Sequence, residues 1–308
     1  MENTRAKTTR NSLILLLTAT IWGMAFVSQR KGMDYMHPFT FNGVRSLIGA
    51  AGILVYILIS RKIAGDKAAK LDWKLNVRAG LLCGIFLTIA STLQQFGIKY
   101  TSVGKAGFIT TLYIIFVPMF GIFLKKKVAP VVWAAAGMAA VGMYLLCMTE
   151  SLRLGAGDIM VFLCAIAFAI QIMTVDHYAA RIDGAVVSCI QFTVCGVVCC
   201  IGALIWGQPT FGQIQEGLGA LLYAGVLSCG VGYTLQIVGQ KGLNPTVAAL
   251  IMSLESVIAT ISGWIAYKIG FLSTDQTLTP RQIAGCVIVF AAVILVQLPP
   301  EWFRFGKK

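Results

Sequence analysis

The sequence predicts an all-α integral membrane protein with ten transmembrane helices. Of its 308 residues, 57% are hydrophobic and only 12% are charged, and the mean hydropathy is +0.81. Soluble globular domains average about 45–50% apolar and about 25% charged residues, so the composition excludes an ordinary soluble enzyme or binding module. The chain also contains ten apolar runs close to the roughly 20 residues that a spanning helix needs. The short connections between these runs exclude a separate water-soluble domain.

Each apolar run ends at charged residues or at glycine, proline, asparagine or aspartate, which commonly interrupt regular structure. A membrane β-barrel needs strict alternation over about ten residues, whereas residues 13–17 are continuously apolar, so the runs predict helices. The first run is longer than a signal-peptide core and contains Trp22 and Gln29, so we expect it to remain as a span. The predicted spans are residues 12–29, 39–60, 77–98, 103–124, 129–148, 157–178, 185–206, 217–239, 245–267 and 281–298.

The formal net charge of +13 is explained mainly by the orientation of the chain. With ten spans, 17 of the 25 lysines and arginines fall on the side of the N-terminus and 7 on the other side. Short cytoplasmic loops of membrane proteins are enriched in these residues, so the N- and C-termini are both predicted to be cytoplasmic. The basic loop 61–76 would also suit lipid headgroups or nucleic acid, but the orientation signal is the favoured interpretation. We therefore expect the lipid bilayer as a partner and no nucleic acid.

A weak internal duplication divides the chain into residues 1–150 and 151–308. The aligned pairs include Trp22 with Phe168 and Arg45 with Gln191 at an offset of 146 residues, and Gln94 with Gln236 and Lys99 with Lys241 at an offset of 142. Each half then holds five spans, and an odd number forces the second half to cross the membrane in the opposite direction. Inverted repeats of this kind are typical of transporters that bind substrate between the repeats near the membrane midplane. A single chain would complete that cavity, so we expect a monomer to suffice.

Several sequence segments resemble the EamA-type members of the drug/metabolite transporter superfamily. They are Thr-Ile-Trp-Gly-Met-Ala-Phe-Val at 20–27, His-Pro-Phe-Thr-Phe-Asn-Gly-Val-Arg at 37–45, Lys-Ala-Gly-Phe at 105–108, Val-Pro at 117–118, Gly-Asp at 157–158 and Ser-Leu-Glu-Ser-Val at 253–257. The resemblance implies ten helices in two EamA-type five-helix repeats that carry small organic solutes, often outward. One departure is that members often end the fourth and ninth spans with Gly-Glu, whereas residues 125–127 are lysines and 267–270 read Tyr-Lys-Ile-Gly.

Two ionisable residues lie well inside predicted spans, Arg45 and Glu255. Such residues cost about 2.5–3.5 kcal/mol on membrane-insertion scales, so both are candidates for function. Burial disfavours a charged carboxyl, and Glu255 is therefore predicted to bind a coupling proton or an amine. The alternative role for Glu255 is an internal ion pair, for example with Arg45. Arg45 shares a helix face with Asn42, and either it binds a substrate carboxylate through two parallel hydrogen bonds or it has a structural role.

Side-chain amides and aromatic rings are the next candidates for a substrate site. Glutamine both donates and accepts hydrogen bonds, which suits a polar solute without the cost of a buried charge. Among the glutamines within spans we expect Gln95, Gln191 and Gln236 to contact substrate, the alternative being hydrogen bonds between helices. Trp22 lies away from the ends of its span and is predicted to line the cavity. Tyr113 aligns with Glu255 at the 142 offset and is expected to pair with it or line the cavity.

Pro118 is a predicted hinge or gate, the alternative being a static kink, because proline removes a backbone donor and clashes with the preceding turn of a helix. We expect no metal and no cofactor other than a coupling proton, since the nine cysteines all lie in apolar runs without zinc-type spacing. The sequence thus predicts a secondary transporter, not an enzyme, in the plasma or inner membrane. It would export amino acids, amines or similar metabolites by alternating access. An energy-independent facilitator or channel is the main alternative, and a membrane-embedded enzyme is a weaker one.

Overall fold

The computed structural model describes residues 2–64, 71–124, 130–147, 155–273 and 275–297, and all regular structure in this part of the chain is helical. Eight of the described helical segments are long and apolar enough to cross a membrane. They are Thr8–Gly32, Pro38–Ala64, Trp73–Tyr100, Val103–Phe123, Ala156–Tyr178, Gly184–Gly207, Leu218–Gln240 and Pro245–Lys268. Two further apolar helices, Pro130–Gly142 and Pro280–Leu295, are too short to meet the same length criterion. The protein is therefore an all-α membrane protein, and eight of the ten predicted spans meet this criterion.

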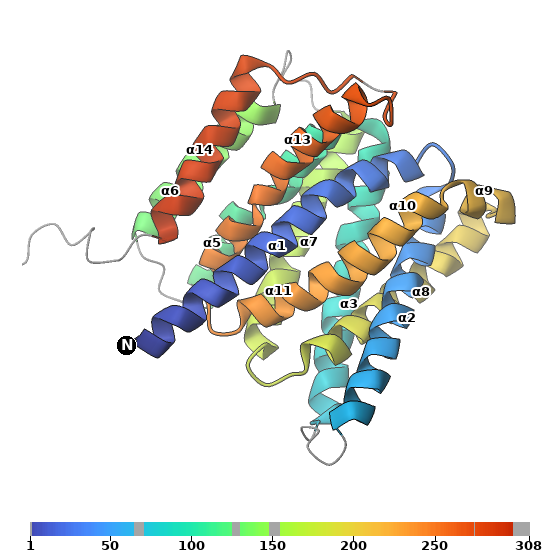
Figure 1. Cartoon of the computed structure of the whole chain (residues 1–308), viewed down its shortest axis with the longest axis horizontal. Helices are drawn as coiled ribbons and strands as arrows, with labels where there is room; N and C mark the ends of the chain where they lie inside the picture. The colour runs from blue at the N-terminus through green and yellow to red at the C-terminus, as the bar shows by residue number, and fades with distance from the viewer. Residues whose placement is uncertain (1, 65–70, 125–129, 148–154, 274, 298–308) are drawn as a thin grey trace, which may run out of the picture.

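The individual helices follow the predicted spans closely, and several spans consist of two or three consecutive helices (Figure 1). The helices are α1 (Glu2–Gly32), α2 (Pro38–Ala64), α3 (Trp73–Tyr100), α4 (Val103–Thr111), α5 (Tyr113–Phe123), α6 (Pro130–Cys147), α7 (Ala156–Tyr178), α8 (Gly184–Gly202), η2 (Ala203–Gly207), α9 (Phe211–Glu216), α10 (Leu218–Leu222), η3 (Tyr223–Gly232), α11 (Tyr233–Gln240), α12 (Pro245–Met252), α13 (Leu254–Lys268) and α14 (Pro280–Gln297). The predicted boundary between the halves, at residues 150 and 151, lies outside the described residues, as do the lysines at 125–127.

Polar residues at the helix starts determine where several spans begin. The side chains of Asp72, Ser102 and Asp183 accept hydrogen bonds from backbone N–H groups in the first turns of α3, α4 and α8. Asn244 does the same for α12, whose first residue is Pro245. The first N–H groups of a helix have no partner within it, so these caps satisfy groups that a bilayer could not.

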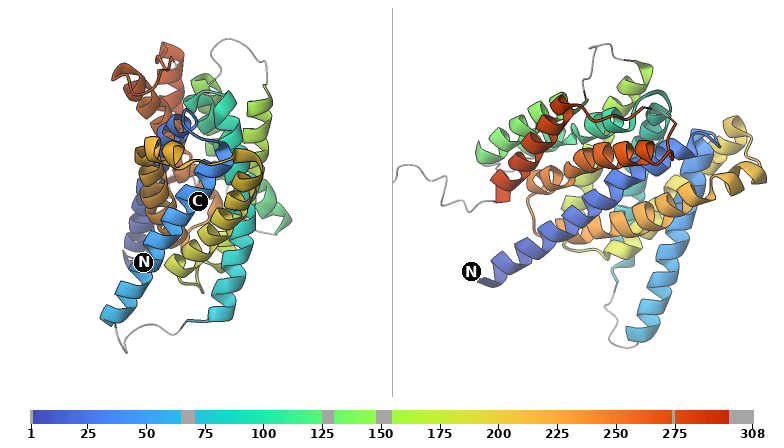
Figure 2. Two further views of the ribbon diagram at one scale, coloured as in Figure 1. Left: turned by 90° about the vertical axis from the view of Figure 1, so that its right-hand side faces the viewer. Right: turned by 45° about the horizontal axis from the view of Figure 1, so that its top comes forward.

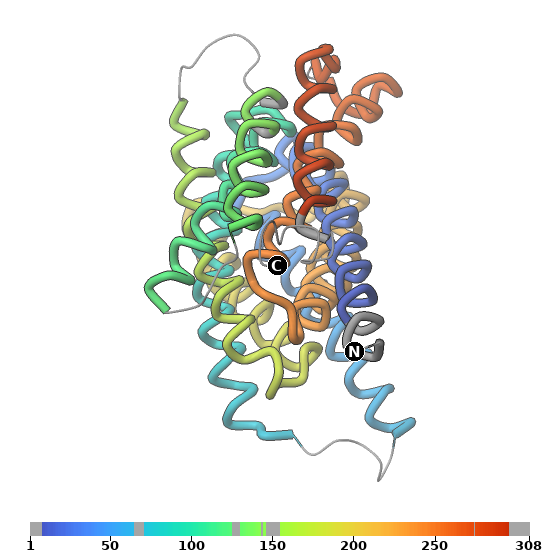
Figure 3. Tube along the Cα trace, turned by 90° about the vertical axis from the view of Figure 1, so that its left-hand side faces the viewer, coloured from blue at the N-terminus to red at the C-terminus, as the bar shows by residue number. Residues whose placement is uncertain are grey.

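The helices form one bundle with a peripheral pair. Helix α3 packs against α7 and α8, α2 packs against α8 and η3, and α1 packs against α11 and α13. Helices α6 and α14 lie side by side and contact the remaining helices much less (Figure 1). At one end of the bundle α2 and α3 extend beyond the other helices (Figures 2 and 3). The central contacts therefore join helices from both halves of the chain.

Two glycines bring α3 and α7 into backbone contact. A Cβ atom on Gly97 would lie 2.8 Å from the Gly157 carbonyl oxygen, and one on Gly157 would lie 2.9 Å from the Gly97 carbonyl oxygen. Small residues commonly allow membrane helices to approach this closely, because association in a bilayer depends on van der Waals packing. The contact leaves no space for a side chain at either position.

A Gly97→Val variant is expected to be less stable than the wild type, because its side chain must push α3 and α7 apart. Overpacking typically costs about 1–3 kcal/mol. The unfolding temperature of detergent-purified protein, followed by tryptophan fluorescence, should fall by several degrees. Gly137→Val in α6 is the matched control, since a Cβ there would meet no atom within 4 Å. Equal unfolding temperatures for the two variants would contradict the packing argument.

The fourth and ninth membrane segments, Val103–Phe123 and Pro245–Lys268, each contain a one-residue break in the regular α-helix. The breaks fall at Leu112, between α4 and α5, and at Ser253, between α12 and α13, and both residues keep right-handed helical backbone angles, so each segment continues as one span. At each break a backbone N–H three residues later, on Ile115 and Ser256, donates to the carbonyl of the break residue, at 2.9 and 3.1 Å. Pro118, the predicted hinge or gate, is buried within α5, and the helix continues through it.

Candidate functional site

A polar cavity lies between the helices of the two halves. Its wall comes from α1, α2, α3, α4, α5, α7, α8, η3, α11 and α13. The space that the centre of a water molecule can reach in it is about 30 Å³, far below the roughly 300–1,000 Å³ typical of small-molecule sites. The cavity is therefore contracted in this structure, and its side chains must move apart to admit an organic solute.

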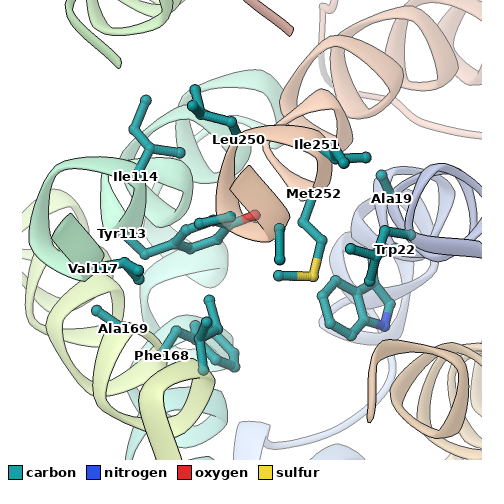
Figure 4. Close-up of a cluster of buried hydrophobic side chains, with 14 of the residues drawn as sticks. Ala19, Trp22, Tyr113, Ile114, Val117, Phe168, Ala169, Leu250, Ile251 and Met252 are labelled. Atoms are coloured by element: carbon teal, nitrogen blue, oxygen red, sulfur yellow. The ribbon is translucent and has the colours of Figure 1, made fainter. Parts of the chain in front are cut away.

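Glu255 and Tyr113 connect the two broken segments inside the cavity. Glu255 is 4% exposed and lies in the first turn of α13, where the helix dipole favours negative charge. Tyr113 is the first residue of α5, and its hydroxyl donates to Glu255 Oε1 at 3.1 Å. Figure 4 shows the Tyr113 ring extending from its helix toward the helix of Leu250 and Met252. The contact predicted from the 142-residue alignment is thus present.

Arg45 also lines the cavity, on α2. Its side chain is buried, its guanidinium carbon lies 5.5 Å from the centre of the Phe41 ring, and its Nε atom has no hydrogen-bond partner. Within the described ranges the ion pairs are Lys31–Asp34 and Lys105–Asp158, so Arg45 and Glu255 do not pair with each other here. A buried cation without a counter-ion is costly unless another group balances its charge. The cavity therefore presents a cation and a carboxyl group at separate places.

Amide groups supply further hydrogen-bonding capacity along the wall. Gln236 Nε2 donates to Gln171 Oε1 at 3.2 Å, and Gln94 Nε2 donates to Thr110 Oγ1 at 3.2 Å. Three amide atoms at the cavity lack a partner, namely Gln29 Oε1, Gln171 Nε2 and Gln236 Oε1. Buried polar atoms are normally hydrogen-bonded, so these atoms are available to water or to a polar solute.

Aromatic rings form much of the remaining wall. Trp22 packs on Tyr233 with the ring centres 4.5 Å apart, and Phe192 meets Tyr233 edge-on at 5.0 Å. Trp22 Nε1 has no partner and is another donor at the cavity. In Figure 4, Trp22, Tyr113 and Phe168 lie around a common central space. Such rings bury large apolar area while their N–H and O–H groups remain able to bind polar atoms.

Three sequence-predicted residues lie away from the cavity wall. Gln95 is fully buried and donates to the Gln29 carbonyl oxygen at 3.1 Å. Gln191 is also fully buried, on the face of α8 that packs against Gly84 of α3. Asn42 is buried near the start of α2, and neither atom of its amide has a partner. The structure therefore brings together Glu255, Tyr113, Gln236, Trp22 and Arg45 but not these three, and Pro118 does not line the cavity either.

Most of the cavity wall consists of residues that align between the two halves. Seven pairs contribute both members to the wall: Trp22–Phe168, Phe26–Ile172 and Ser46–Phe192 at an offset of 146, and Leu87–Cys229, Ser91–Tyr233, Gln94–Gln236 and Tyr113–Glu255 at an offset of 142. Three of these wall residues, Phe168, Phe192 and Tyr233, were not predicted from the sequence to contact substrate. Phe168 could have been predicted from the sequence, because it aligns with Trp22, which was already predicted to line the cavity.

Polar contacts outside the cavity wall join helices of the two halves. At the starts of α4 and α7, Lys105 Nζ lies 2.6 Å from Asp158 Oδ2, and Thr101 donates to Asp158 Oδ1 at 2.9 Å. Near the start of α1, Asn11 Nδ2 donates to the carbonyl oxygen of Lys241, the residue that follows α11, at 2.7 Å. One of these contacts is therefore an ion pair with one buried partner, and the other is an amide-to-carbonyl hydrogen bond.

The chain is similar to transporters along nearly its whole length. The family profile described as "EamA-like transporter family" matches residues 10–148 and again residues 155–298. One relative, an "Uncharacterized transporter" of Archaeoglobus fulgidus, is 27% identical over 290 residues, covering 92% of this chain and 84% of the relative. "Uncharacterized transporter YwfM" of Bacillus subtilis is 24% identical over 94% of both chains. A protein of known crystal structure shares the fold with a TM-score of 0.74 at 16% identity, over 96% of this chain and 99% of its own.

Proposed function

Because this chain belongs to the EamA-like transporter family, we propose that it is a secondary transporter that exports small organic metabolites such as amino acids or amines. The observation that carries the proposal is the central cavity, with Arg45 and Glu255 at separate positions among amides and aromatic rings. A cation suits a substrate carboxylate, and a carboxyl group suits an amine or a coupling proton. In this proposal Trp22, Gln236 and Tyr113 contribute to substrate selectivity.

The proposed architecture is two inverted repeats of five spans each, built from residues 1–150 and 151–308. Two observations support it: the family profile matches each half separately, and seven aligned pairs line one cavity. The peripheral helices α6 and α14 complete the ten spans, since 18 residues extend about 27 Å against a hydrocarbon core of about 30 Å. Both termini would be cytoplasmic, in the plasma or inner membrane, with a monomer as the transporting unit.

Alternating access then requires the two ends of the bundle to open in turn. In the proposed orientation the Lys105–Asp158 ion pair closes the outer end and the Asn11–Lys241 hydrogen bond closes the inner end. Each contact joins the first helix of one half to a residue of the other half that lies near the start of a broken segment, namely Lys105 in the first turn of α4 and Lys241 before α12. Repeats of this type rock against each other around a fixed site, so opening one end would release one of these contacts.

Counterflow in proteoliposomes tests the proposal. Vesicles loaded with an unlabelled solute should accumulate the same labelled solute transiently, for at least one member of a panel of amino acids and amines. A carrier that reorients with bound substrate shows this exchange, whereas a pore gives only equilibration and an enzyme would alter the solute. Equilibration without transient accumulation, for a solute that does enter, would exclude the carrier mechanism in favour of a channel.

A further inference from the structure

Two adjoining hollows lie on the surface between α2 and the η3–α11 segment, apart from the central cavity. The first is an apolar groove of about 430 Å³, lined by residues such as Gly52, Ile53, Val231 and Leu235. A Cβ atom on Gly52 would meet no protein atom within 4 Å, so neighbouring side chains do not fill the groove there. The groove is open to the lipid-facing side of two membrane helices.

The second hollow continues from the first at the end of the bundle where α2 ends and α3 begins. It contains about 610 Å³ and shares Tyr56, Thr234 and Val238 with the apolar groove. The two hollows are therefore one continuous depression. Three basic residues line its polar end, namely Arg61, Arg181 and Lys241.

These basic residues have no carboxylate partner in the described part of the chain. Neither of the two ion pairs found there involves them. Lys241 Nζ donates to the Ile182 carbonyl oxygen at 3.3 Å, and Arg181 Nη2 donates to the His177 carbonyl oxygen at 3.4 Å. Their positive charge is thus not neutralised by these contacts.

Two acidic residues also line this hollow, but both serve as helix caps. Asp72 Oδ1 accepts from the Leu75 N–H at 3.0 Å, and Asp183 Oδ1 accepts from the Ala185 and Val186 N–H groups at 2.9 and 3.2 Å. A carboxylate at a helix N-terminus interacts with the positive end of the helix dipole. The polar end of the depression therefore keeps an excess of positive charge.

We propose that this depression is a binding site for an anionic phospholipid, with an acyl chain in the apolar groove and the phosphate beside the three basic residues. From Gly49 to Arg61 helix α2 rises about 18 Å, close to half of a hydrocarbon core of about 30 Å. The groove thus has the length of one leaflet, with the basic residues at its headgroup level. Basic pockets between membrane helices recognise anionic headgroups in this way. A soluble anion would leave the apolar groove empty.

Native mass spectrometry of the full chain in detergent tests the site directly. Phosphatidylglycerol should bind more tightly than phosphatidylcholine with identical acyl chains, and glycerol phosphate should not displace it. A double variant, Arg61→Gln with Arg181→Gln, should reduce the preference for phosphatidylglycerol by about fivefold for each charge removed. Gly52→Leu, which fills the groove, should weaken the binding of both lipids.

The controls carry equivalent changes elsewhere. Arg78→Gln removes an exposed charge from α3 outside the depression, and Gly137→Leu adds a side chain at an open position of α6. Both should bind phosphatidylglycerol as the wild type does. Equal affinity of the wild type for the two lipids, or displacement by glycerol phosphate, would overturn the proposal. Because the readout is bound lipid rather than transport, the result stands apart from the test of the proposed function.

Discussion

A Glu255→Gln protein is expected to fold and insert normally but to lose transport driven by a pH gradient. The substitution preserves size and still offers an oxygen to the Tyr113 hydroxyl, which donates to Glu255 Oε1 at 3.1 Å. It removes the group that would exchange a proton or hold an amine inside the cavity. Removing one member of a buried, hydrogen-bonded charge interaction typically costs about 2–5 kcal/mol, so gradient-driven uptake should fall at least about 30-fold.

Two assays on the same proteoliposomes separate the roles of the carboxyl group. If Glu255 serves proton coupling alone, counterflow should persist while gradient-driven uptake is lost. If it also binds an amine, both should be lost. The matched control is Glu216→Gln, which changes an exposed glutamate of α9 outside the cavity and should behave as the wild type. Wild-type activity of Glu255→Gln in both assays would rule out either role.

An Arg45→Gln protein is expected to discriminate poorly between solutes with and without a carboxylate. Arg45 is buried at the cavity, and its Nε has no partner, so a substrate carboxylate is the group that would balance its charge. Hydrogen bonds to charged groups contribute about 1.5–3 kcal/mol. The half-saturating concentration of a transported amino acid should therefore rise by roughly 10- to 150-fold, whereas that of the corresponding decarboxylated amine should not rise.

Comparison of an amino acid with its own amine provides an internal control for folding. An equal loss for both solutes would show that Arg45 has the structural role, the alternative considered for it in the sequence. Arg45→Lys should give an intermediate effect, because lysine keeps the charge but not the two-pronged geometry of the guanidinium. Circular dichroism and gel filtration of each variant would confirm that the comparison concerns folded protein.

The all-helical membrane fold and eight of the predicted spans could be predicted from the sequence, because the length and ends of a helix depend on residues that are close together in the chain. Apolar length locates the spans, and residues such as Asp72 and Asp183 mark their starts by capping. The breaks were not predicted, because Leu112 and Ser253 are not residues that normally interrupt a helix. The segments on either side of the two breaks contact each other, α4 with α13 and α5 with α12.

The candidate site was predicted only in part, because its residues depend on the rotation of each helix within the bundle. Adjacent residues on a helix point about 100° apart. Gln94 lines the cavity and Gln95 does not, and Phe192 lines it whereas Gln191 does not. Gln94 and Gln95 are equally polar, so polarity alone could not predict which of the two faces the cavity. Glu255 could be predicted without knowing the rotation of its helix, because a carboxyl group deep in an apolar span is rare whichever way it points.

The Tyr113–Glu255 contact suggests what was gained by fusing the two proposed repeats into one chain. Two identical copies of the second repeat, assembled with exact two-fold symmetry, would place two glutamates opposite each other at this point. Two like charges that close cannot both remain ionised. Two copies of the first repeat would instead place two tyrosines there and supply no carboxyl group. In a fused chain the two halves can differ in sequence, so Tyr113 supplies a hydroxyl donor from the first half and Glu255 supplies a single acid from the second. A homodimer of either half could not have this unequal pair.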